Sequence, residues 1–270
     1  MAIYYFIFSI FIFLLGLCMG SFVNALIYRL NLGLSMWDRS MCPICKHKLN
    51  ILDLIPVFSF LFLKAKCRYC KNKISWQYPL VEFIIGIIFL SIFLKFINNY
   101  NFINYGLLET IDLSLLFIDA IILIIIFVYD LRYYIIPNKV LFPGMIIGVM
   151  VLIFESIYIW SLELIIMHAL SVFIVFGFFL ILYLISKEKW IGTGDVKFGI
   201  LLGLILPWQQ SLIMLFFAYV IGAIVGIILL ISKKKKLKEK VPMGTFLVIG
   251  TFVSIFFGEI ILEWYLNLIL

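Results

Sequence analysis

Two aspartates in this chain stand at the edges of apolar runs, where an acidic side chain is costly. Asp130 ends one run in the segment FVYDLRYYIIPNKV, and Asp195 starts another in the segment GTGDVK. Charged side chains inside membrane segments cost about 2.5–3.5 kcal/mol on insertion scales, so they mark candidate functional sites. Two carboxylates that meet can share one proton, and one then activates water as general base while the other acts as general acid. Asp130 and Asp195 are therefore a candidate catalytic pair of the kind that aspartic proteases use.

The glycines beside Asp195 have a chemical use of their own. Gly192 and Gly194 carry no Cβ, so the backbone there can adopt positive φ angles and approach another chain closely. We expect this loop to lay a substrate strand beside Asp195. The alternative is that Asp195 only caps the helix that begins there, because short glycine motifs are weak signals by themselves.

Four cysteines lie in one polar loop as two C-x-x-C pairs. Cys42 and Cys45 form the first pair in MCPICKHKLN, and Cys67 and Cys70 form the second in KCRYCKNKIS. Two such pairs make a tetrahedral thiolate site suited to Zn²⁺, and four cysteines close that site, which makes the zinc structural. His47 is then a spare residue and not a ligand. Disulfides or idle thiols are the alternative.

The elements that must position these residues are membrane helices. Of the 270 residues, 66% are hydrophobic, against about 45–50% in soluble domains. The apolar runs are continuous, which indicates helices and not the alternating strands of a barrel. We expect an all-α polytopic membrane protein with about eight transmembrane helices and a small cytoplasmic zinc-binding loop. The expected spans are 3–27, 79–97, 111–130, 140–158, 163–185, 196–207, 211–231 and 244–268.

The sixth of these spans is too short for a hydrocarbon core of about 30 Å. We expect its end near Asp195 to be recessed into the membrane.

The lysines and arginines predict the orientation of the helices. Of the 21 basic residues, nine lie in 29–78 and six in the run at 233–240, whereas the alternate loops 98–110, 158–162 and 208–210 carry none. By the positive-inside rule the basic loops are cytoplasmic and both termini lie outside. Asp130 and Asp195 then lie at the same depth, at the cytoplasmic border of the membrane.

Three further acids within expected spans are candidates for a role in the site, and their roles stay open. Asp112 and Asp119 share one helical face with Asp130, and that face is expected to point into the bundle. Asp119 either takes a direct part or is hydrogen-bonded or water-facing. Glu82 either lines the same cavity or reaches toward the cytoplasmic surface.

The order of motifs along the chain resembles the type IV prepilin peptidases, which are bifunctional leader peptidase/N-methyltransferases of the GxGD intramembrane aspartic peptidases. The matching segments are GSFVNALIYRL at 20–30, the paired C-x-x-C with LDLIPVFSFL between them, ISWQYPLVE at 74–82, GTGDVK at 192–197 and PMGTFL at 242–247. The resemblance covers nearly the whole chain.

This resemblance implies that Asp130 and Asp195 are the catalytic aspartates. The substrate would be a prepilin or pseudopilin of type IV pili, type II secretion or competence, cut on the cytoplasmic side ahead of its hydrophobic segment. The same enzyme would methylate the new N-terminus with S-adenosylmethionine as the methyl donor. The zinc loop belongs to the versions that carry this second activity, although the residues do not place the S-adenosylmethionine site.

From these considerations we expect three parts: a first transmembrane helix at 1–28, a zinc-binding loop associated with methyl transfer at 29–78, and a transmembrane peptidase domain at 79–270. The expected partners are the prepilin substrate and membrane lipid, and no nucleic acid. The location is a cell membrane, which the chain crosses several times.

Two other functions fit part of the sequence. A transporter or channel could use the buried aspartates, but its acids should lie near the midplane at broken helices, not at the membrane border. A non-enzymatic anchor could present a zinc module to a partner, but it leaves the GTGD motif unexplained.

Overall fold

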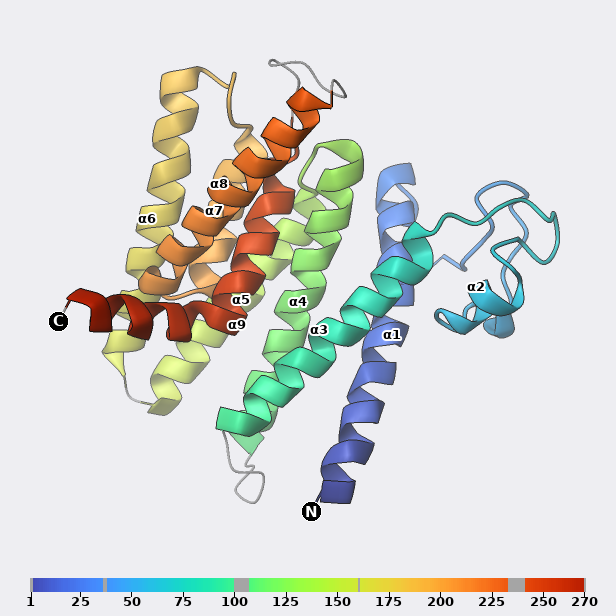
Figure 1. Cartoon of the computed structure of the whole chain (residues 1–270), viewed down its shortest axis with the longest axis horizontal. Coiled ribbons are helices and arrows are strands. Elements are labelled where there is room, and N and C mark those ends of the chain that lie inside the picture. Colours follow the sequence, from blue (N-terminus) through green and yellow to red (C-terminus); the bar gives the residue numbers. More distant parts are fainter. Residues whose placement is uncertain (1, 36–37, 100–106, 160, 233–240, 270) are drawn as a thin grey trace. The chain divides into compact units, whose positions relative to one another are not determined.

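The computed structural model describes residues 2–35, 38–99, 107–159, 161–232 and 241–269, and these residues are largely helical. The basic run at 233–240 and most of the loop 98–110, both used above to predict orientation, lie outside the described residues. The helices, drawn in Figure 1, are α1 (Ala2–Leu32), η1 (Ile51–Asp53), α2 (Phe58–Phe62), α3 (Gln77–Asn99), α4 (Leu107–Tyr133), α5 (Asn138–Ile159), α6 (Leu162–Ser186), α7 (Thr193–Ile205), α8 (Trp208–Ile231) and α9 (Met243–Ile269).

Each of the eight predicted spans is a helix, and the prediction of an all-α polytopic membrane fold is confirmed. Seven of these helices in the described part of the chain are long and apolar enough to cross a membrane. The exception is α7, which has 13 residues and is therefore about 20 Å long. Its side chains are buried along most of its length, against α5 and α6. A short helix is tolerated at membrane depth where protein, not lipid, surrounds it.

The chain divides into two compact units, Met1–Ile124 and Ile125–Leu270, with the boundary inside α4. The cysteine loop lies in the first unit, and Asp130 and Asp195 lie in the second. The two candidate sites are therefore built on separate scaffolds.

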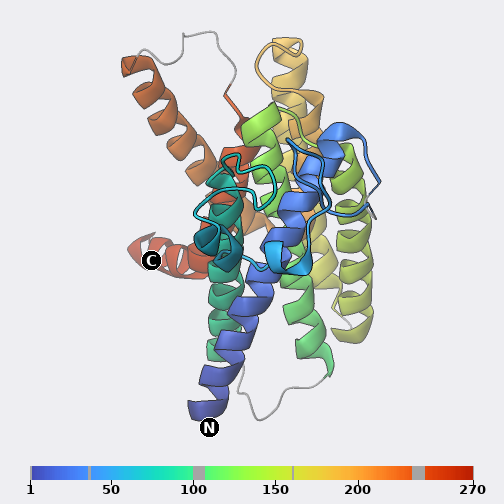
Figure 2. The same ribbon diagram turned by 90° about the vertical axis from the view of Figure 1, so that its right-hand side faces the viewer.

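In the first unit, α1 and α3 pack closely through glycines, side by side as Figure 2 shows. A Cβ added at Gly20 would lie 2.5 Å from the Cα of Glu82, and one added at Gly16 would lie 2.8 Å from the Cα of Gly86. The two glycines of α1 are four residues apart, which is the small-xxx-small pattern of close helix pairs in membranes. This contact fixes how the chain enters and leaves the cysteine loop.

In the second unit, α7 makes a similar contact with α6. A Cβ at Gly203 would lie 2.5 Å from the Cα of Val172, and one at Gly199 would lie 3.0 Å from the ring of Phe179. The helices α8 and α9 form the other closely packed pair of this unit. The first turn of α7 carries Asp195, so this packing positions one of the two candidate aspartates.

The α1–α3 contact predicts a specific sensitivity to side-chain size. Gly20→Leu should destabilise the protein by at least about 1–3 kcal/mol, because the new side chain meets backbone that cannot rotate away. Gly226→Leu is the matched control, since a Cβ at Gly226 has no atom within 4 Å. Thermal unfolding in detergent should give a lower Tm for the first variant alone. Equal Tm values for the two variants would show that Gly20 does not pack against the backbone of α3.

Candidate functional site

Asp130 is buried near the end of α4, and the start of α9 supplies its hydrogen-bond donors. The backbone N–H of Thr245 donates to Oδ2 of Asp130 at 2.9 Å, and the Thr245 hydroxyl donates to the same oxygen at 3.3 Å. A Cβ added at Gly244 would lie 3.0 Å from this Oδ2. The first turn of a helix offers free N–H groups and the positive end of the helix dipole, both of which stabilise a carboxylate.

Asp195 lies in the first turn of α7 and is half-buried. Its Oδ2 accepts a hydrogen bond from the N–H of Gly192 at 3.2 Å, so the capping contact that was the alternative for this residue is present. A cap and a chemical role do not exclude each other, because Oδ1 is not part of this contact.

The glycine loop does not use the positive φ angles that its glycines permit. Gly192 has an extended backbone with φ −83°, and Gly33 is the only glycine with positive φ among the residues that the structure describes. A Cβ at Gly194 would lie 3.4 Å from the Cβ of Ile136, which is an ordinary contact distance. A glycine pattern alone therefore does not show that glycine is required at either position.

The structure brings the two aspartates together around one apolar side chain. Ile136, buried in the turn between α4 and α5, faces Gly194 and also lies 3.3 Å from where a Cβ of Gly244 would be. Each of these glycines adjoins one aspartate. The carboxylate of Asp195 is close enough to Asp130 for the charge of Asp130 to act on it. Asp130 and Asp195 therefore lie near the same apolar side chain in the second unit, and their role as a catalytic pair stays a prediction.

Three residues near the aspartates were not singled out from the sequence. Thr245 and Gly244 belong to PMGTFL, a segment that entered only through the resemblance. Its signal is a proline and a small residue before an apolar run, which is typical of a helix start. Tyr219 of α8 is also close enough to interact electrostatically with Asp195. Nothing in the sequence around Tyr219 indicated this proximity.

Glu82 of α3 contacts the cysteine loop. Its side chain is buried, and its Oε2 accepts a hydrogen bond from the backbone N–H of Val57 at 2.7 Å. Glu82 therefore ties the cysteine loop to the helix pair. One turn away, Asn24 of α1 donates to the carbonyl of Tyr78 at 3.0 Å, while its buried Oδ1 has no partner.

The remaining acids of α4 are less enclosed. Asp112 and Asp119 are both half-buried, and the geometry does not single out either as a member of the aspartate site.

The four loop cysteines converge as predicted and could hold a metal ion. The Sγ atoms of Cys42, Cys45, Cys67 and Cys70 all lie within 4.8 Å of one another. The Cys42 and Cys70 sulfurs are 4.0 Å apart, close to the roughly 3.8 Å expected between thiolates on a tetrahedral zinc ion. His47 is not in this cluster, and its ring lies against that of Tyr69, with 3.7 Å between the centroids and 35° between the ring planes.

The two C-x-x-C pairs repeat one local structure. In the first, the Cys42 N–H donates to the carbonyl of residue 47, and in the second the Cys67 N–H donates to that of residue 72. Lys46 and Lys71, each directly after the second cysteine of its pair, both have φ 58°. The backbone N–H of Asn72 is the main cause that lowers the pKa of Cys70 to about 7. A thiol with a lowered pKa is a better metal ligand because the thiolate is the binding form.

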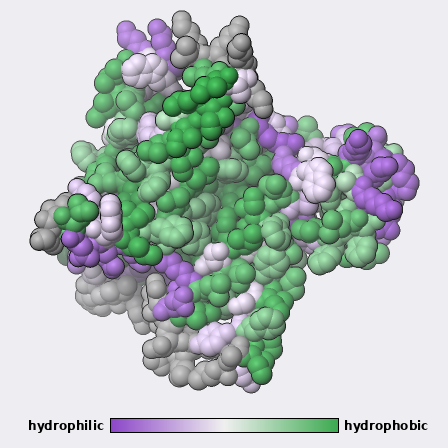
Figure 3. Space-filling model, in the orientation of Figure 1, coloured by the Kyte–Doolittle hydropathy of each residue, from purple (hydrophilic) through white to green (hydrophobic). Residues whose placement is uncertain are grey.

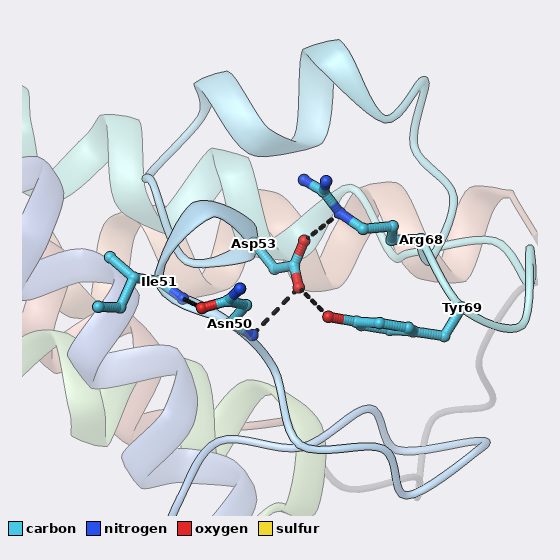
Figure 4. A network of polar contacts seen from close by, with 5 residues as sticks. All are labelled: Asn50, Ile51, Asp53, Arg68 and Tyr69. Atoms are coloured by element: carbon cyan, nitrogen blue, oxygen red, sulfur yellow. Dashed lines mark hydrogen bonds and ion pairs between the residues drawn. The ribbon is translucent and has the colours of Figure 1, made fainter.

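Asp53 braces the loop between the two pairs, as Figure 4 shows. Its carboxylate accepts from the Arg68 guanidinium at 2.7 Å, from the Tyr69 hydroxyl at 3.0 Å and from the Asn50 N–H at 3.1 Å. Burial by itself raises the pKa of Asp53, but these three donors outweigh it and hold the pKa below its ordinary value. The brace therefore needs the ionised carboxylate.

Two family models match the chain. Residues 14–96 match the bacterial peptidase A24 N-terminal domain, and residues 117–227 match the type IV leader peptidase family. The first match contains all four clustered cysteines, and the second contains both aspartates. No solved structure matches the chain.

Several curated proteins named prepilin leader peptidase/N-methyltransferase are similar to this chain. The Myxococcus xanthus protein is 33% identical over 84% of this chain and 64% of its own length. The Aeromonas salmonicida protein is 27% identical over 96% of this chain and 94% of its own. The Bacillus subtilis protein is 27% identical over 96% of this chain and 98% of its own.

The Asp53 brace predicts a local change in the cysteine loop. Asp53→Ala should speed trypsin cleavage between residues 46 and 73, because three hydrogen bonds that tie Asn50, Arg68 and Tyr69 together are lost, each worth about 0.5–1.5 kcal/mol at most. Asp53→Asn, which keeps an acceptor but no charge, should lie between this variant and the wild type.

The same brace should weaken in acid. Because the folded pKa of Asp53 is lowered, its stabilisation is complete above the ordinary value and is lost as the pH falls through the folded pKa. Hydrogen exchange of the loop should therefore differ between wild type and Asp53→Asn at pH 6 and converge at about pH 2. An identical difference at both pH values would contradict the role given to this carboxylate.

Proposed function

This chain belongs to the type IV leader peptidase family, and on that premise we propose that it cleaves the leader peptide of prepilins or pseudopilins with Asp130 and Asp195 as the catalytic pair. The observation that carries the proposal is that Ile136 lies between the glycines that adjoin these two aspartates, which come from different helices within the part of the chain that matches the peptidase family. Each carboxylate accepts an N–H from the first turn of a helix or its cap.

In the proposed mechanism the two carboxylates share one proton. The ionised carboxylate takes a proton from water, whose oxygen attacks the carbonyl carbon of the scissile peptide bond. The protonated carboxyl then gives its proton to the leaving nitrogen as the C–N bond breaks. Oδ2 of Asp130 is occupied by Thr245 and Oδ2 of Asp195 by Gly192, which leaves the other oxygens for this exchange.

The loop before α7 is the proposed place for the substrate backbone. Gly192 is exposed, and a Cβ there would have only ordinary contacts. The absence of a side chain at Gly192 keeps the approach to Asp195 open. Gly194 of the same loop lies against Ile136.

The second proposed activity is methylation of the new N-terminal residue with S-adenosylmethionine as methyl donor. This proposal rests on the double name of the relatives and on the match of 14–96 to the N-terminal domain of the family. We place it with the first helix, 1–28, and the loop 29–78, and the peptidase with 79–270. S-adenosylmethionine would supply an activated methyl group, and the site that binds it is not assigned.

The ion proposed for the cysteine cluster is a structural Zn²⁺ held by Cys42, Cys45, Cys67 and Cys70. Four thiolates at tetrahedral spacing fit zinc and leave no open position for a substrate. When bound, the ion would supply folding energy to a loop that has little apolar core.

The proposed orientation places the cysteine loop and the aspartates on the cytoplasmic side, with both termini outside, following the distribution of basic residues. Membrane lipid is the expected surrounding. The family match favours an enzyme over the transporter or channel that the buried aspartates also allowed.

The aspartate pair predicts a loss of cleavage without a loss of fold. Asp130→Asn and Asp195→Asn should each reduce prepilin cleavage by at least about 10²–10⁴-fold. The double variant should be no slower than the slower single variant, because the two residues act as a unit. Purified protein in detergent, incubated with a prepilin and sampled by mass spectrometry, gives the rates.

Asp112→Asn is the matched control for that experiment, since it changes the same residue type on the same helix. It should cleave at the wild-type rate. Near-normal cleavage by Asp195→Asn would remove the aspartate pair from the mechanism.

The cysteine cluster predicts a separation of the two activities. Cys42→Ser should release zinc, make residues 38–76 sensitive to protease, and reduce methylation more than cleavage. Cys18→Ser is the control, because Cys18 lies in α1 outside the cluster. The measurements are zinc per chain and the mass of the pilin N-terminus with and without S-adenosylmethionine.

Two outcomes would overturn this assignment. Wild-type protein without zinc, and with four freely titratable thiols, would remove the metal. A folded Cys42→Ser variant that loses both activities in parallel would contradict the division of the chain into a peptidase part and a methyl-transfer part.

A further inference from the structure

The loop between α1 and α3 exposes a group of large apolar side chains. We call this group the α2 patch; it consists of Ile51, Leu52, Phe58, Leu61, Phe62 and Trp76. Phe62 is 83% exposed, Ile51 80% and Trp76 70%. A loop in water would not keep so many apolar side chains uncovered on one small element. Some apolar medium or partner must therefore cover them.

The patch is one continuous feature of the loop. The elements η1 and α2 contact each other. Trp76 meets α2 through Phe60, which is buried, with 4.8 Å between the ring centroids. The inner side of α2 is thus anchored to the loop, and its outer side carries Phe58, Leu61 and Phe62.

The bond between Val57 and Glu82 sets the depth of the patch. Val57 directly precedes α2, and its N–H donates to Glu82 at 2.7 Å. Glu82 lies inside the candidate span Gln77–Asn98, about 7.5 Å along the helix from Gln77. The chain from Leu32 to Gln77 therefore does not simply extend away from the membrane. It folds back, and α2 begins at the level of the membrane-spanning part of α3.

The figures agree with this arrangement within the first unit. In Figures 1 and 2, α2 lies beside the middle of α1 and not beyond its end. Figure 3 shows the same loop with hydrophilic surface at its outer end and more hydrophobic surface along the side where α2 lies.

The backbone at Val57 is held in a conformation that needs such an anchor. Val57 has φ 61° and ψ −50°, which is a γ-turn geometry that is strained for a β-branched residue. The N–H of Phe58 closes the turn on the carbonyl of Pro56. A strained turn persists only when its surroundings fix it, and the buried carboxylate of Glu82 is the contact that does so.

We propose that the α2 patch is a membrane-docking surface that inserts into the interfacial layer of the same bilayer that the helices cross. The occupant is lipid, because the Val57–Glu82 hydrogen bond holds the start of α2 at the depth of a helix long and apolar enough to span the membrane. The opposite end of the loop carries the C-x-x-C pairs and their exposed lysines, among them Lys46, Lys48, Lys71 and Lys73. The two ends of the loop thus differ in polarity, as expected of an element whose apolar side lies in the membrane interface.

This proposal does not depend on either enzymatic activity. It depends on the span assignment and on the Glu82 contact, and it places the cysteine cluster at the membrane surface instead of in the bulk solution.

The test is the accessibility of a nitroxide label at residue 62. Phe62→Cys in a Cys18→Ser background is labelled and reconstituted into vesicles of phosphatidylcholine and phosphatidylglycerol, and peptide mapping verifies the labelled position. Lys48→Cys, on the outer end of the loop, is the matched control. Electron paramagnetic resonance then compares collisions with oxygen, which concentrates in lipid, and with a water-soluble nickel complex.

The expected result is more frequent collision with oxygen than with nickel at residue 62 and the reverse at residue 48. Ile51→Cys, at a second exposed position, should behave like residue 62. Nickel collisions that dominate at both 51 and 62 would place the patch in water and overturn the proposal. Low collision rates with both reagents would show that protein covers the patch, and would overturn it as well.

Discussion

The structure depends on how a carboxylate is held in an apolar helical bundle. A charge placed there without donors would cost several kcal/mol, and the carboxyl group would instead keep its proton and could not act as a base. Asp130 is held by the start of α9, and Asp195 by the residue that caps α7. Both contacts require that a helix begin at the place where a carboxylate lies. The positions at which α7 and α9 begin are therefore as important to the site as the two aspartates themselves.

The first unit uses the same solution for a different purpose. Glu82 is also a buried carboxylate that accepts a backbone N–H, but the donor belongs to the cysteine loop. The contact thus connects a polar module to a helix pair that is otherwise apolar. In the second unit such contacts hold the carboxylates that the proposed function makes reactive. In the first unit the contact holds the cysteine loop.

Much of this arrangement could be predicted from local signals. Hydropathy predicted the eight helices outside the cysteine loop, because apolar runs of this length have few other structures available. It did not predict η1 and α2 within that loop. Residue spacing gave the cysteine cluster, because each C-x-x-C pair forms its own turn. The partners of the acids could not be predicted, because Thr245 reaches Asp130 over 115 residues of sequence. The position of Ile136 beside Gly194 and Gly244 could not be predicted either, because nothing in its short apolar segment marks it out. The extended backbone of Gly192 likewise depends on tertiary packing.

The repeated structure of the two C-x-x-C pairs bears on the order of folding. Each pair closes its own hydrogen bonds within ten residues, from 40 to 49 and from 65 to 74, so each can form as soon as that stretch leaves the ribosome. Joining them requires closure of the chain between, whose entropic cost grows only with the logarithm of its length. Neither step requires residues after 74. The module can therefore mature while most of the membrane helices are still unsynthesised, and its assembly is decoupled from theirs.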